Sequence, residues 1–414
     1  MNKISTTEVQ EVQEVQQSLV VPLLLKKAIT QLTSNNMQPL CAYIYDLKSL
    51  ASHAQAMVDA LPENCQLFYA AKANAEAPIL ATLKPIVHGF EAASGGELSW
   101  LKENLPDQKL IFGGPGKLDE ELHQAISDGV ELLHVESLYE LQRIQIIGSQ
   151  LNTQVDILLR MNIALGDIQT TKLTMGGKAT PFGLDESQLP EAIAIIKQSP
   201  NIKLQGFHFH LMSHQLCRIN HLKLMTLYFD TFKHWQAKYQ LSVQHLNVGG
   251  GIGVNYNDAH HVFDWLEFCR NLKVLIQKKA MNDIQIRFEC GRYVTAACGY
   301  YCMEVLDIKK NHGEYFVIAR GGTHHFRTPA AQNHSHPFSV YKGANKLLDS
   351  PTLKGEKVTI VGQLCTPKDI LAKQQWVDNI SVGDHVVFNH AGAYAWNISH
   401  QNFLMHKKPE FLYV

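Results

Sequence analysis

Short apolar runs and amphipathic segments alternate along the middle of the chain. The apolar runs have the composition of buried strands, and the segments between them have helical periodicity. Such alternation is typical of a parallel sheet, either closed into a (β/α)8 barrel or open and doubly wound. We expect the barrel, with strands over 67–71, 86–91, 109–112, 131–135, 155–161, 203–210, 244–248 and 284–288. The expected helices cover 96–103, 118–128, 137–147, 186–197, 220–239 and 262–280.

The pattern changes at the end of the last of these strands. Short strand-like runs punctuated by glycine and proline follow at 299–309, 315–319, 357–361 and 385–388, so a mostly β domain is expected over 293–414. The barrel itself should occupy 48–292. A strand-like run in 37–47 has no helix partner and is expected to join the β domain. Residues 1–36 should form a helical arm, with the Glu-Val-Gln repeat of 8–17 at its periphery.

Composition narrows the possible functions. The chain has 414 residues, 45% of them hydrophobic, which is ordinary for a globular protein. A net charge of −1 argues against a general nucleic-acid-binding protein, and no apolar run reaches the length of a membrane span. The eight cysteines include no CxxC pair, and the start lacks a signal-peptide core. We therefore expect reduced thiols and a cytoplasmic protein, with no nucleic-acid or membrane partner.

Chemistry in such a barrel belongs at the carboxyl ends of its strands. One strand there ends in the run Tyr-Ala-Ala-Lys-Ala-Asn, which contains a single lysine, Lys72. Burial of an ammonium group is costly, so this lysine either reaches out to solvent or is held for chemistry. The functional alternative is a Schiff-base lysine, whose neutral amine attacks an aldehyde. Glu91 and Arg160 lie at the ends of other expected strands.

A glycine run and a histidine cluster follow two further strands. The run from Gly249 through Gly250 to Gly251 could bring backbone N–H groups close to a phosphate, although tight turns also need glycine. His208 and His210 could be zinc ligands, but no carboxylate or thiolate lies near them in sequence, and we expect no metal. They could instead be core histidines, or an imidazole stacked on an aromatic ring, with Ser213 donating to a phosphate.

Several other polar residues have both a structural and a functional interpretation. Glu289 and Arg292 could form an ordinary ion pair, or could face a ring nitrogen and an anion. Cys365 lies in a polar turn, where a thiol is either inert or a proton donor. The histidine-rich tract around Arg327 could bind metal, but we prefer a substrate loop in which this arginine meets a carboxylate. Tyr394 stands among small residues, which suits close approach of a ligand.

Nine motifs appear in one order along the chain: YAAKAN, ASGGEL, GPGKLDEEL, HVES, HFHLMS, GGG, ECGR, GQLCTPKD and AGAY. On these motifs the chain resembles the fold-type III decarboxylases that depend on pyridoxal 5'-phosphate (PLP), the family of diaminopimelate and ornithine decarboxylases. The resemblance runs from Pro39 to the C-terminus. It implies an α/β, alanine racemase-like fold, in which a PLP-binding TIM-type barrel carries a C-terminal β domain. It also implies PLP as cofactor and a homodimer with shared active sites.

The resemblance assigns roles to individual residues. Lys72 is implied to form the Schiff base, and Glu289 to pair with the pyridine nitrogen. His210 is implied to stack on the ring, with Glu91 and Arg160 behind the cofactor. The expected phosphate and cofactor contacts are Ser213, Gly250, Gly251, Arg292 and Tyr394. Cys365 is implied to be a proton-donating thiol that a partner subunit inserts into the site.

The loop after Cys365 departs from the better-known family members. Diaminopimelate decarboxylases usually continue Glu-Ser-Gly-Asp, and ornithine decarboxylases place Asp directly after the cysteine to hold a distal amine. Thr366 has no charge for that purpose. The departures are similar to the branch that decarboxylates citryl conjugates in siderophore assembly. We expect a citryl-diaminopropionate-like substrate, bound by Arg327, Thr366 and Lys368. Diaminopimelate or another basic amino acid is the alternative, ahead of an amino-acid racemase or a non-catalytic PLP carrier.

Overall fold

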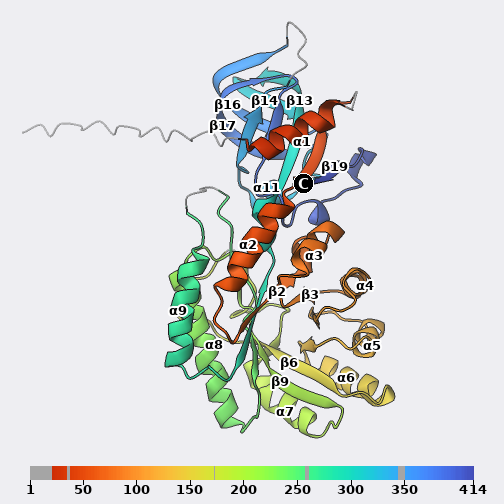
Figure 1. Ribbon diagram of the computed structural model, residues 1–414, viewed down its shortest axis with the longest axis vertical. Helices are drawn as coiled ribbons and strands as arrows, with labels where there is room; N and C mark the ends of the chain where they lie inside the picture. The colour runs from red at the N-terminus through yellow and green to blue at the C-terminus, as the bar shows by residue number, and fades with distance from the viewer. Residues whose placement is uncertain (1–20, 35–37, 172, 257–260, 344–349) are drawn as a thin grey trace, which may run out of the picture.

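The computed structural model describes residues 21–34, 38–171, 173–256, 261–343 and 350–414. The molecule is elongated, with a β-rich domain at one end and a helix-covered barrel at the other (Figure 1). The Glu-Val-Gln repeat at 8–17 lies outside the described residues. None of the helices that the structure describes combines the length and the apolarity needed to cross a bilayer.

Eight parallel strands pair in the order in which they occur in the chain. The ring closes because β5 pairs with β6 and β12 pairs with β2. This closure confirms the (β/α)8 barrel and excludes the open, doubly wound sheet. The strands are β2 (Cys65–Ala70), β3 (Gly89–Ala92), β4 (Leu110–Phe112), β5 (Leu132–Val135), β6 (Val155–Asn162), β9 (Ile202–His208), β11 (His245–Asn247) and β12 (Gln285–Cys290).

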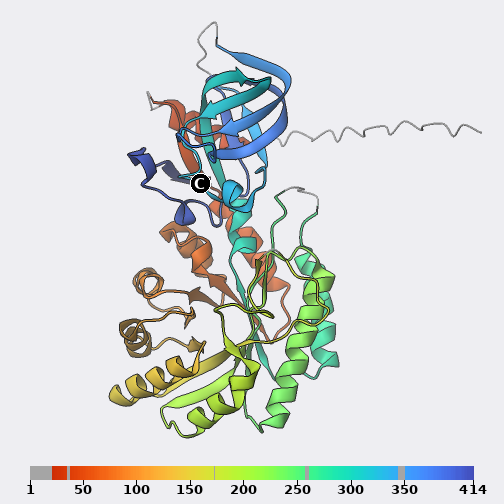
Figure 2. The same ribbon diagram turned by 180° about the vertical axis from the view of Figure 1, so that it is seen from behind.

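Helices cover the outside of the barrel, and Figure 2 shows the green pair α8 and α9 standing against its strands. Two of the helices begin at serine caps directly after barrel strands. Ser94 accepts a hydrogen bond from the N–H of Glu97, and Ser137 accepts one from that of Glu140. The helices are α2 (Leu47–Asp59), α3 (Ala77–Leu83), α4 (Gly95–Asn104), α5 (Asp119–Ser127), α6 (Leu138–Gln150), α7 (Leu189–Lys197), α8 (Arg218–Lys238) and α9 (Trp265–Lys278).

Alternation along the strands separates two apolar regions. Leu67 and Tyr69 of β2 belong to the large core. Phe68, which lies between them, belongs to a separate small cluster with residues of β4, β5 and β6. Because successive side chains of a strand point to opposite faces, this cluster fills the barrel interior. The Arg287 guanidinium lies 5.0 Å from the centre of the Phe68 ring and 2.7 Å from Glu131. Side chains therefore fill this part of the barrel interior.

The β domain is built on the long strand β13 (Gly299–Asn311). The strand β1 (Cys41–Tyr45) pairs antiparallel with β13 and parallel with β19 (Glu410–Tyr413). The helix α1 (Leu23–Ser34) packs Leu25, Ala28 and Ile29 against this region. The expected strands did not include β15, β17 and β19. The remaining strands of the domain are β14 (Glu314–Ala319), β15 (Phe338–Tyr341), β16 (Thr352–Val361), β17 (Ile370–Ser381) and β18 (His385–Phe388).

Candidate active site

Lys72 lies in a single 3-10 turn, Ala71–Ala73, directly after β2. Its Nζ is 2.9 Å from both carboxylate oxygens of Glu91 on the neighbouring strand β3. The side chain of Lys72 is 42% exposed, whereas that of Glu91 is 5% exposed, so part of the lysine side chain reaches solvent. Burial alone lowers the pKa of Lys72, but the charge of Glu91, with smaller contributions from Tyr394 and Glu289, more than offsets burial and raises it. The amine therefore carries a proton, and Glu91 is the carboxylate nearest to it.

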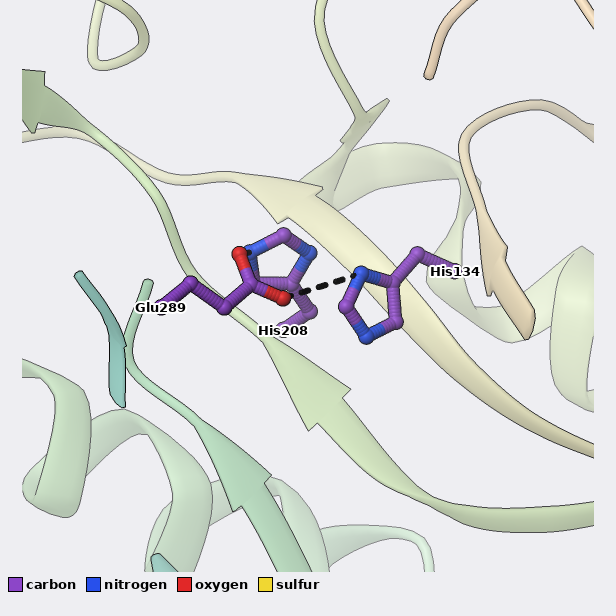
Figure 3. Close-up of side chains that lie close together, drawn as sticks. All are labelled: His134, His208 and Glu289. Atoms are coloured by element: carbon purple, nitrogen blue, oxygen red, sulfur yellow. Dashed lines mark ion pairs between the residues drawn. The ribbon is translucent and has the colours of Figure 1, made fainter. Parts of the chain in front are cut away.

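Glu289 of β12 occupies the centre of the barrel mouth. Asn247, the last residue of β11, donates a hydrogen bond of 2.7 Å to its Oε1. His134 of β5 approaches Oε1 at 3.5 Å, and His208 of β9 approaches Oε2 at 3.5 Å (Figure 3). The two imidazole rings are 4.2 Å apart. Side chains from β5, β9 and β11 thus surround the carboxyl group of Glu289, and each can donate or accept a hydrogen bond.

This carboxyl group is poorly solvated. Burial, with a further contribution from the charge of Glu91, raises the pKa of Glu289 to about 8. Burial also lowers the pKa of His134 and of His208 well below the ordinary range, so both imidazoles are neutral at pH 7. The Nδ1 of His134 and both ring nitrogens of His208 have no hydrogen-bond partner. The cluster is therefore suited to sharing a proton or to facing a cation.

The fold brings to His208 a carboxylate that its neighbours in sequence lack, because Glu289 reaches it from β12. The expectation that no metal binds stays a prediction. The donor atoms of His134, His208 and Glu289 lie within 4.8 Å of one another, a set that could also ligate a metal ion. Distance along the sequence did not reveal this set because its three residues come from three strands.

The raised pKa of Glu289 has a consequence for stability without cofactor. Between its ordinary value of 4.5 and about 8, the folded protein keeps a proton that the unfolded chain has released. Stability of the cofactor-free protein therefore falls across this range. The Glu289→Gln variant lacks this cost, so its melting temperature relative to the parent should rise from about pH 5 to about pH 8, by an amount equivalent to a few kcal/mol.

Thermal melts of both cofactor-free proteins across this range measure the effect. His134, His208, Lys72 and Glu91 are present in both proteins, so their titration largely cancels in the comparison. A Glu103→Gln variant, at an exposed position on α4, serves as the control and should show no such trend. A difference between Glu289→Gln and the parent that does not change with pH would contradict the assignment.

The glycine run after β11 packs tightly against its neighbours. The N–H of Gly249 donates to the side chain of Asn247 at 2.8 Å, and that of Gly250 donates to Nδ1 of His210 at 3.2 Å. Gly249 and Gly251 have φ of +65° and +84°, backbone angles that residues with a side chain rarely adopt. A Cβ at Gly250 would lie 2.0 Å from the carbonyl oxygen of Glu289. The run therefore fixes the backbone beside both His210 and Glu289.

A Gly250→Ala substitution should consequently displace the backbone of β12 at Glu289. We expect a loss of about 1–3 kcal/mol in the free energy of unfolding, typical of overpacking, together with weaker binding of the ligand held here. Gly116→Ala is the matched control, because a Cβ at Gly116 meets nothing within 4 Å. Denaturant unfolding of the two variants gives the comparison, and equal stabilities would contradict this interpretation.

An unneutralised arginine lies beyond the glycine run. Arg292 begins the short helix α10 (Arg292–Thr295), donates to the hydroxyl of Tyr256 at 2.8 Å, and stacks 4.5 Å from the ring centroid of Tyr394. No carboxylate forms an ion pair with Arg292 within the described ranges. Tyr394 has φ of +50°, and its N–H donates to the carbonyl of Ala73 at 2.8 Å. This strained backbone joins the phenol of the β domain to the turn that carries Lys72.

The other sequence-predicted barrel residues surround the same mouth. Ser213, in the short strand β10 (Met212–Ser213), accepts a hydrogen bond at its carbonyl from Thr171. Arg160 of β6 donates to Glu136 at 2.7 Å, and Glu136 also accepts from the backbone of Gly114 and Gly183. Arg160 is therefore held by a carboxylate from the next strand of the barrel. Burial lowers the pKa of His210 well below its usual range, so its ring is neutral.

The predicted residues of the β domain fall into a separate group. Cys365, Thr366 and Lys368 lie in the loop between β16 and β17, and the thiol is exposed. Within the described part of the chain, no hydrogen bond or ion pair joins this loop to Lys72. Arg327 is exposed, and its N–H donates to Ser399. Its neighbour Thr328 donates to the carbonyl of Tyr394, whose N–H donates to Ala73, so the backbone at Arg327 is linked to the turn that carries Lys72.

Buried Asp369 organises the cysteine loop. Its two carboxylate oxygens accept hydrogen bonds from the N–H groups of Thr323, at 2.6 Å, and Leu364, at 2.8 Å. Burial raises the pKa of this carboxyl. The cysteine loop is thus fastened to the segment that leads to Arg327.

Several residues of the site were not predicted individually. His134 and Glu136 were noted only as parts of the motif HVES, and Asn247 and Tyr256 were not noted at all. The available signal was strand alternation, since His134 and Glu136 continue the inward face of β5. Asn247 directly precedes the glycine run, and its bonds to both Gly249 and Glu289 depend on the closed barrel.

The side chains present fit a phosphorylated pyridine aldehyde. Arg292, without a carboxylate partner, and the turn at Gly251 suit an anionic phosphate. Glu289, buried and flanked by unpartnered imidazole nitrogens, suits a protonated ring nitrogen. Lys72 stands at the open mouth with a carboxylate beside it to receive a proton. A closed barrel with this site and a C-terminal β domain defines a PLP enzyme of fold type III.

Comparison with known proteins narrows this class. A family model described as "Pyridoxal-dependent decarboxylase, pyridoxal binding domain" matches residues 47–296. The chain is 44% identical, over 94% of its length and 98% of the relative, to 2-[(L-alanin-3-ylcarbamoyl)methyl]-2-hydroxybutanedioate decarboxylase of Staphylococcus aureus. It is 30% identical to L-glutamyl-[BtrI acyl-carrier protein] decarboxylase of Niallia circulans, over 92% of this chain and 90% of that one.

Among solved structures, a mutant of diaminopimelate decarboxylase of Helicobacter pylori in complex with L-lysine is similar to this chain. The TM-score is 0.82 at 25% identity, with 93% of this chain and 94% of that chain covered. The chain belongs to the pyridoxal-dependent decarboxylase family. It is a PLP-dependent decarboxylase of amino-acid substrates.

Proposed function

We propose that the substrate is an amino acid whose side chain carries a polycarboxylate arm through an amide, as in a citryl-diaminopropionate intermediate of siderophore biosynthesis. The observation that carries this proposal is the 44% identity, spanning both domains, to the Staphylococcus aureus enzyme. The substrate in that enzyme's name joins an alanine unit at carbon 3, through a carbamoyl group, to a hydroxybutanedioate. An uncharged Thr366 and the cations Arg327 and Lys368 agree with an anionic arm.

Each residue of the barrel mouth has a proposed role. PLP, when bound, supplies an aldehyde and a ring that withdraws electrons from the α-carbon of an attached amino acid. Lys72 would hold the cofactor covalently, and Glu91 is the nearest acceptor for the proton that its amine must lose. Glu289 would hold positive charge at the ring nitrogen, and Asn247 keeps its carboxylate oriented. His210 and Arg160 would also hold the cofactor's ring.

The phosphate-binding group lies at one side of this mouth. Arg292 provides the charge, and Tyr394 holds its guanidinium against an aromatic face. The hydroxyl of Ser213 and the backbone of Gly250 and Gly251 complete the proposed contacts. These groups orient the cofactor, and the buried barrel interior excludes water from its inner face.

A complete site is proposed to need two copies of the chain. Cys365 has no contact with Lys72 of its own chain within the described residues, and its thiol is exposed. We propose a homodimer in the cytoplasm, in which the cysteine loop of one subunit reaches the barrel mouth of the other. The thiol then delivers a proton to the α-carbon after CO₂ has left.

A Cys365→Ala variant should therefore slow product formation by about 10²-fold or more, the usual contribution of a positioned proton donor, and should misdirect protonation. Chromatography of the products alongside CO₂ release separates the two effects. Cys217→Ala, which removes the other exposed cysteine, is the control and should behave as the parent. An unchanged rate and product profile in Cys365→Ala would remove the proposed role.

Diaminopimelate decarboxylation is the second candidate, favoured by the solved structure with a TM-score of 0.82. Release of CO₂ from a panel containing the citryl conjugate, meso-diaminopimelate, ornithine, lysine and arginine decides between the candidates. Turnover of diaminopimelate with none of the citryl conjugate would overturn the proposed substrate. Turnover of the citryl conjugate alone is the expected result.

A further inference from the structure

A second concave site lies in the β domain, away from Lys72. It has a volume of about 270 Å³ and is lined by residues of five segments: Gln38, Pro39, Leu306, Arg320, His325, Gln363, His406 and Lys407. This volume is slightly below the range of about 300–1,000 Å³ usual for drug-sized ligands, so a smaller molecule would fill it. No lining residue is acidic, and two carry a permanent positive charge.

Neither cation is neutralised by a carboxylate. Arg320 donates to the backbone carbonyl of Pro39, and Lys407 donates to the side chain of Gln38 at 3.5 Å. Within the described ranges no ion pair involves Arg320 or Lys407. The charges of Arg320 and Glu410 both shift the pKa of the Cys41 thiol, but Glu410 is not among the residues that line the cavity. Two cations around a hollow without an acid create a local field that favours an anion.

Imidazoles form part of this wall. His325 is 1% exposed, and the backbone of Lys407 is a hydrogen-bond partner of its ring. Its Nδ1 lies 3.1 Å from the hydroxyl of Tyr301. The ring of His324 lies 3.9 Å from that of His325 and 5.1 Å from that of His406. The imidazole of His406, which also lines the cavity, can donate a hydrogen bond to a ligand oxygen.

The cavity is joined to the cysteine loop. The N–H of Gln363 donates to the carbonyl of Gly321 at 2.8 Å, and its side chain accepts from the N–H of Gly321 at 3.0 Å. Gly321 follows Arg320, and Gln363 precedes Cys365 by two positions. A ligand bound by Arg320 would therefore be connected, through the hydrogen bonds between Gly321 and Gln363, to the backbone of the cysteine loop.

From this cavity and its two unneutralised cations we propose a binding site for a small polycarboxylate beside the cysteine loop. A carboxylate can accept two parallel bonds from the guanidinium of Arg320, while a second carboxylate meets Lys407. The choice of a tricarboxylate over phosphate rests on the proposed function. The ligand is either the carboxylate arm of the substrate or a free polycarboxylate, and the two share this chemistry.

Calorimetric titration of citrate into the PLP-loaded enzyme, in a low-salt buffer without other polyvalent anions, tests the site. Citrate should bind the parent, about tenfold or more weakly in Arg320→Gln, and several-fold more weakly in Lys407→Gln. Lys408→Gln, an exposed neighbour outside the lining, is the control and should bind as the parent does. Lys407→Gln keeps the test valid if loss of the Arg320 bond to Pro39 impairs folding.

The proposal would be overturned if citrate did not bind, or if both Arg320→Gln and Lys407→Gln bound citrate with the affinity of the parent. Tighter binding of inorganic phosphate than of citrate would also overturn it. Steady-state kinetics separate the two sources. If the arm occupies the cavity, Arg320→Gln raises KM for the conjugate without lowering kcat, and citrate competes with it. If the ligand is free, citrate binds without competing and KM is unchanged. A parent enzyme that binds citrate but releases no CO₂ from the conjugate would refute the proposed function and leave the site standing.

Discussion

Replacing Lys72 with arginine is expected to lower decarboxylation by at least about 10³-fold while leaving a folded protein. A guanidinium keeps the positive charge beside Glu91, which the fold requires because that carboxylate is only 5% exposed. It cannot lose its proton to become a nucleophile. The substitution therefore separates the chemistry of Lys72 from its electrostatic role.

Borohydride reduction of the PLP-loaded parent, followed by peptide mass spectrometry, locates the covalent link. The label should fall on Lys72 and should be absent from Lys72→Arg. Lys48→Arg, at an exposed position on α2, is the control and should keep both label and activity. Labelling of another lysine in the parent, or full activity in Lys72→Arg, would contradict the proposed centre.

Glu289→Gln is expected to lower kcat by about 10²–10³-fold, the usual cost of removing a preorganised electrostatic partner from a reacting centre. The amide has nearly the same shape, so the hydrogen bond from Asn247 and the contacts with His134 and His208 can persist. It carries no negative charge to hold a proton on the ring nitrogen. The effect should therefore appear in kcat and in the visible spectrum of the bound cofactor.

Spectra of the PLP-loaded parent and of Glu289→Gln, recorded across pH, check the cause. The parent should keep the spectrum of a protonated ring to higher pH than the variant does. Glu103→Gln again serves as the control. Equal kcat values, or identical spectra at every pH, would mean that Glu289 does not act on the ring nitrogen.

The barrel could be predicted from the sequence because its strands are buried on both faces. Each then appears as a short continuous apolar run, and each of the eight expected runs overlaps an observed strand. The β domain was harder to predict. The strand β17 (Ile370–Ser381) is exposed or partly exposed at four consecutive positions, 373–376, and Gln374 has φ of +50°, so its apolar alternation is interrupted. The strand β19 has four residues, too few for a pattern.

Some residues of the active site could also be predicted from the sequence, and others could not. The rule that chemistry lies at the carboxyl ends of barrel strands was enough to single out Lys72, Glu91 and Glu289. The contact of His134 with Glu289 could not be predicted, because it joins β5 to β12 across the interior of the closed barrel. The cavity at Arg320 combines segments from both ends of the chain, and no local pattern marks it.

The proposed substrate is an amino acid with an amide-linked polycarboxylate arm. A comparison of kcat/KM for CO₂ release from the citryl-diaminopropionate conjugate and from meso-diaminopimelate, with the same PLP-loaded preparation, tests this proposal. We expect a kcat/KM at least about 10²-fold higher for the conjugate, because Thr366 offers no charge to a distal ammonium group. A kcat/KM that is equal for the two substrates, or higher for diaminopimelate, would contradict it.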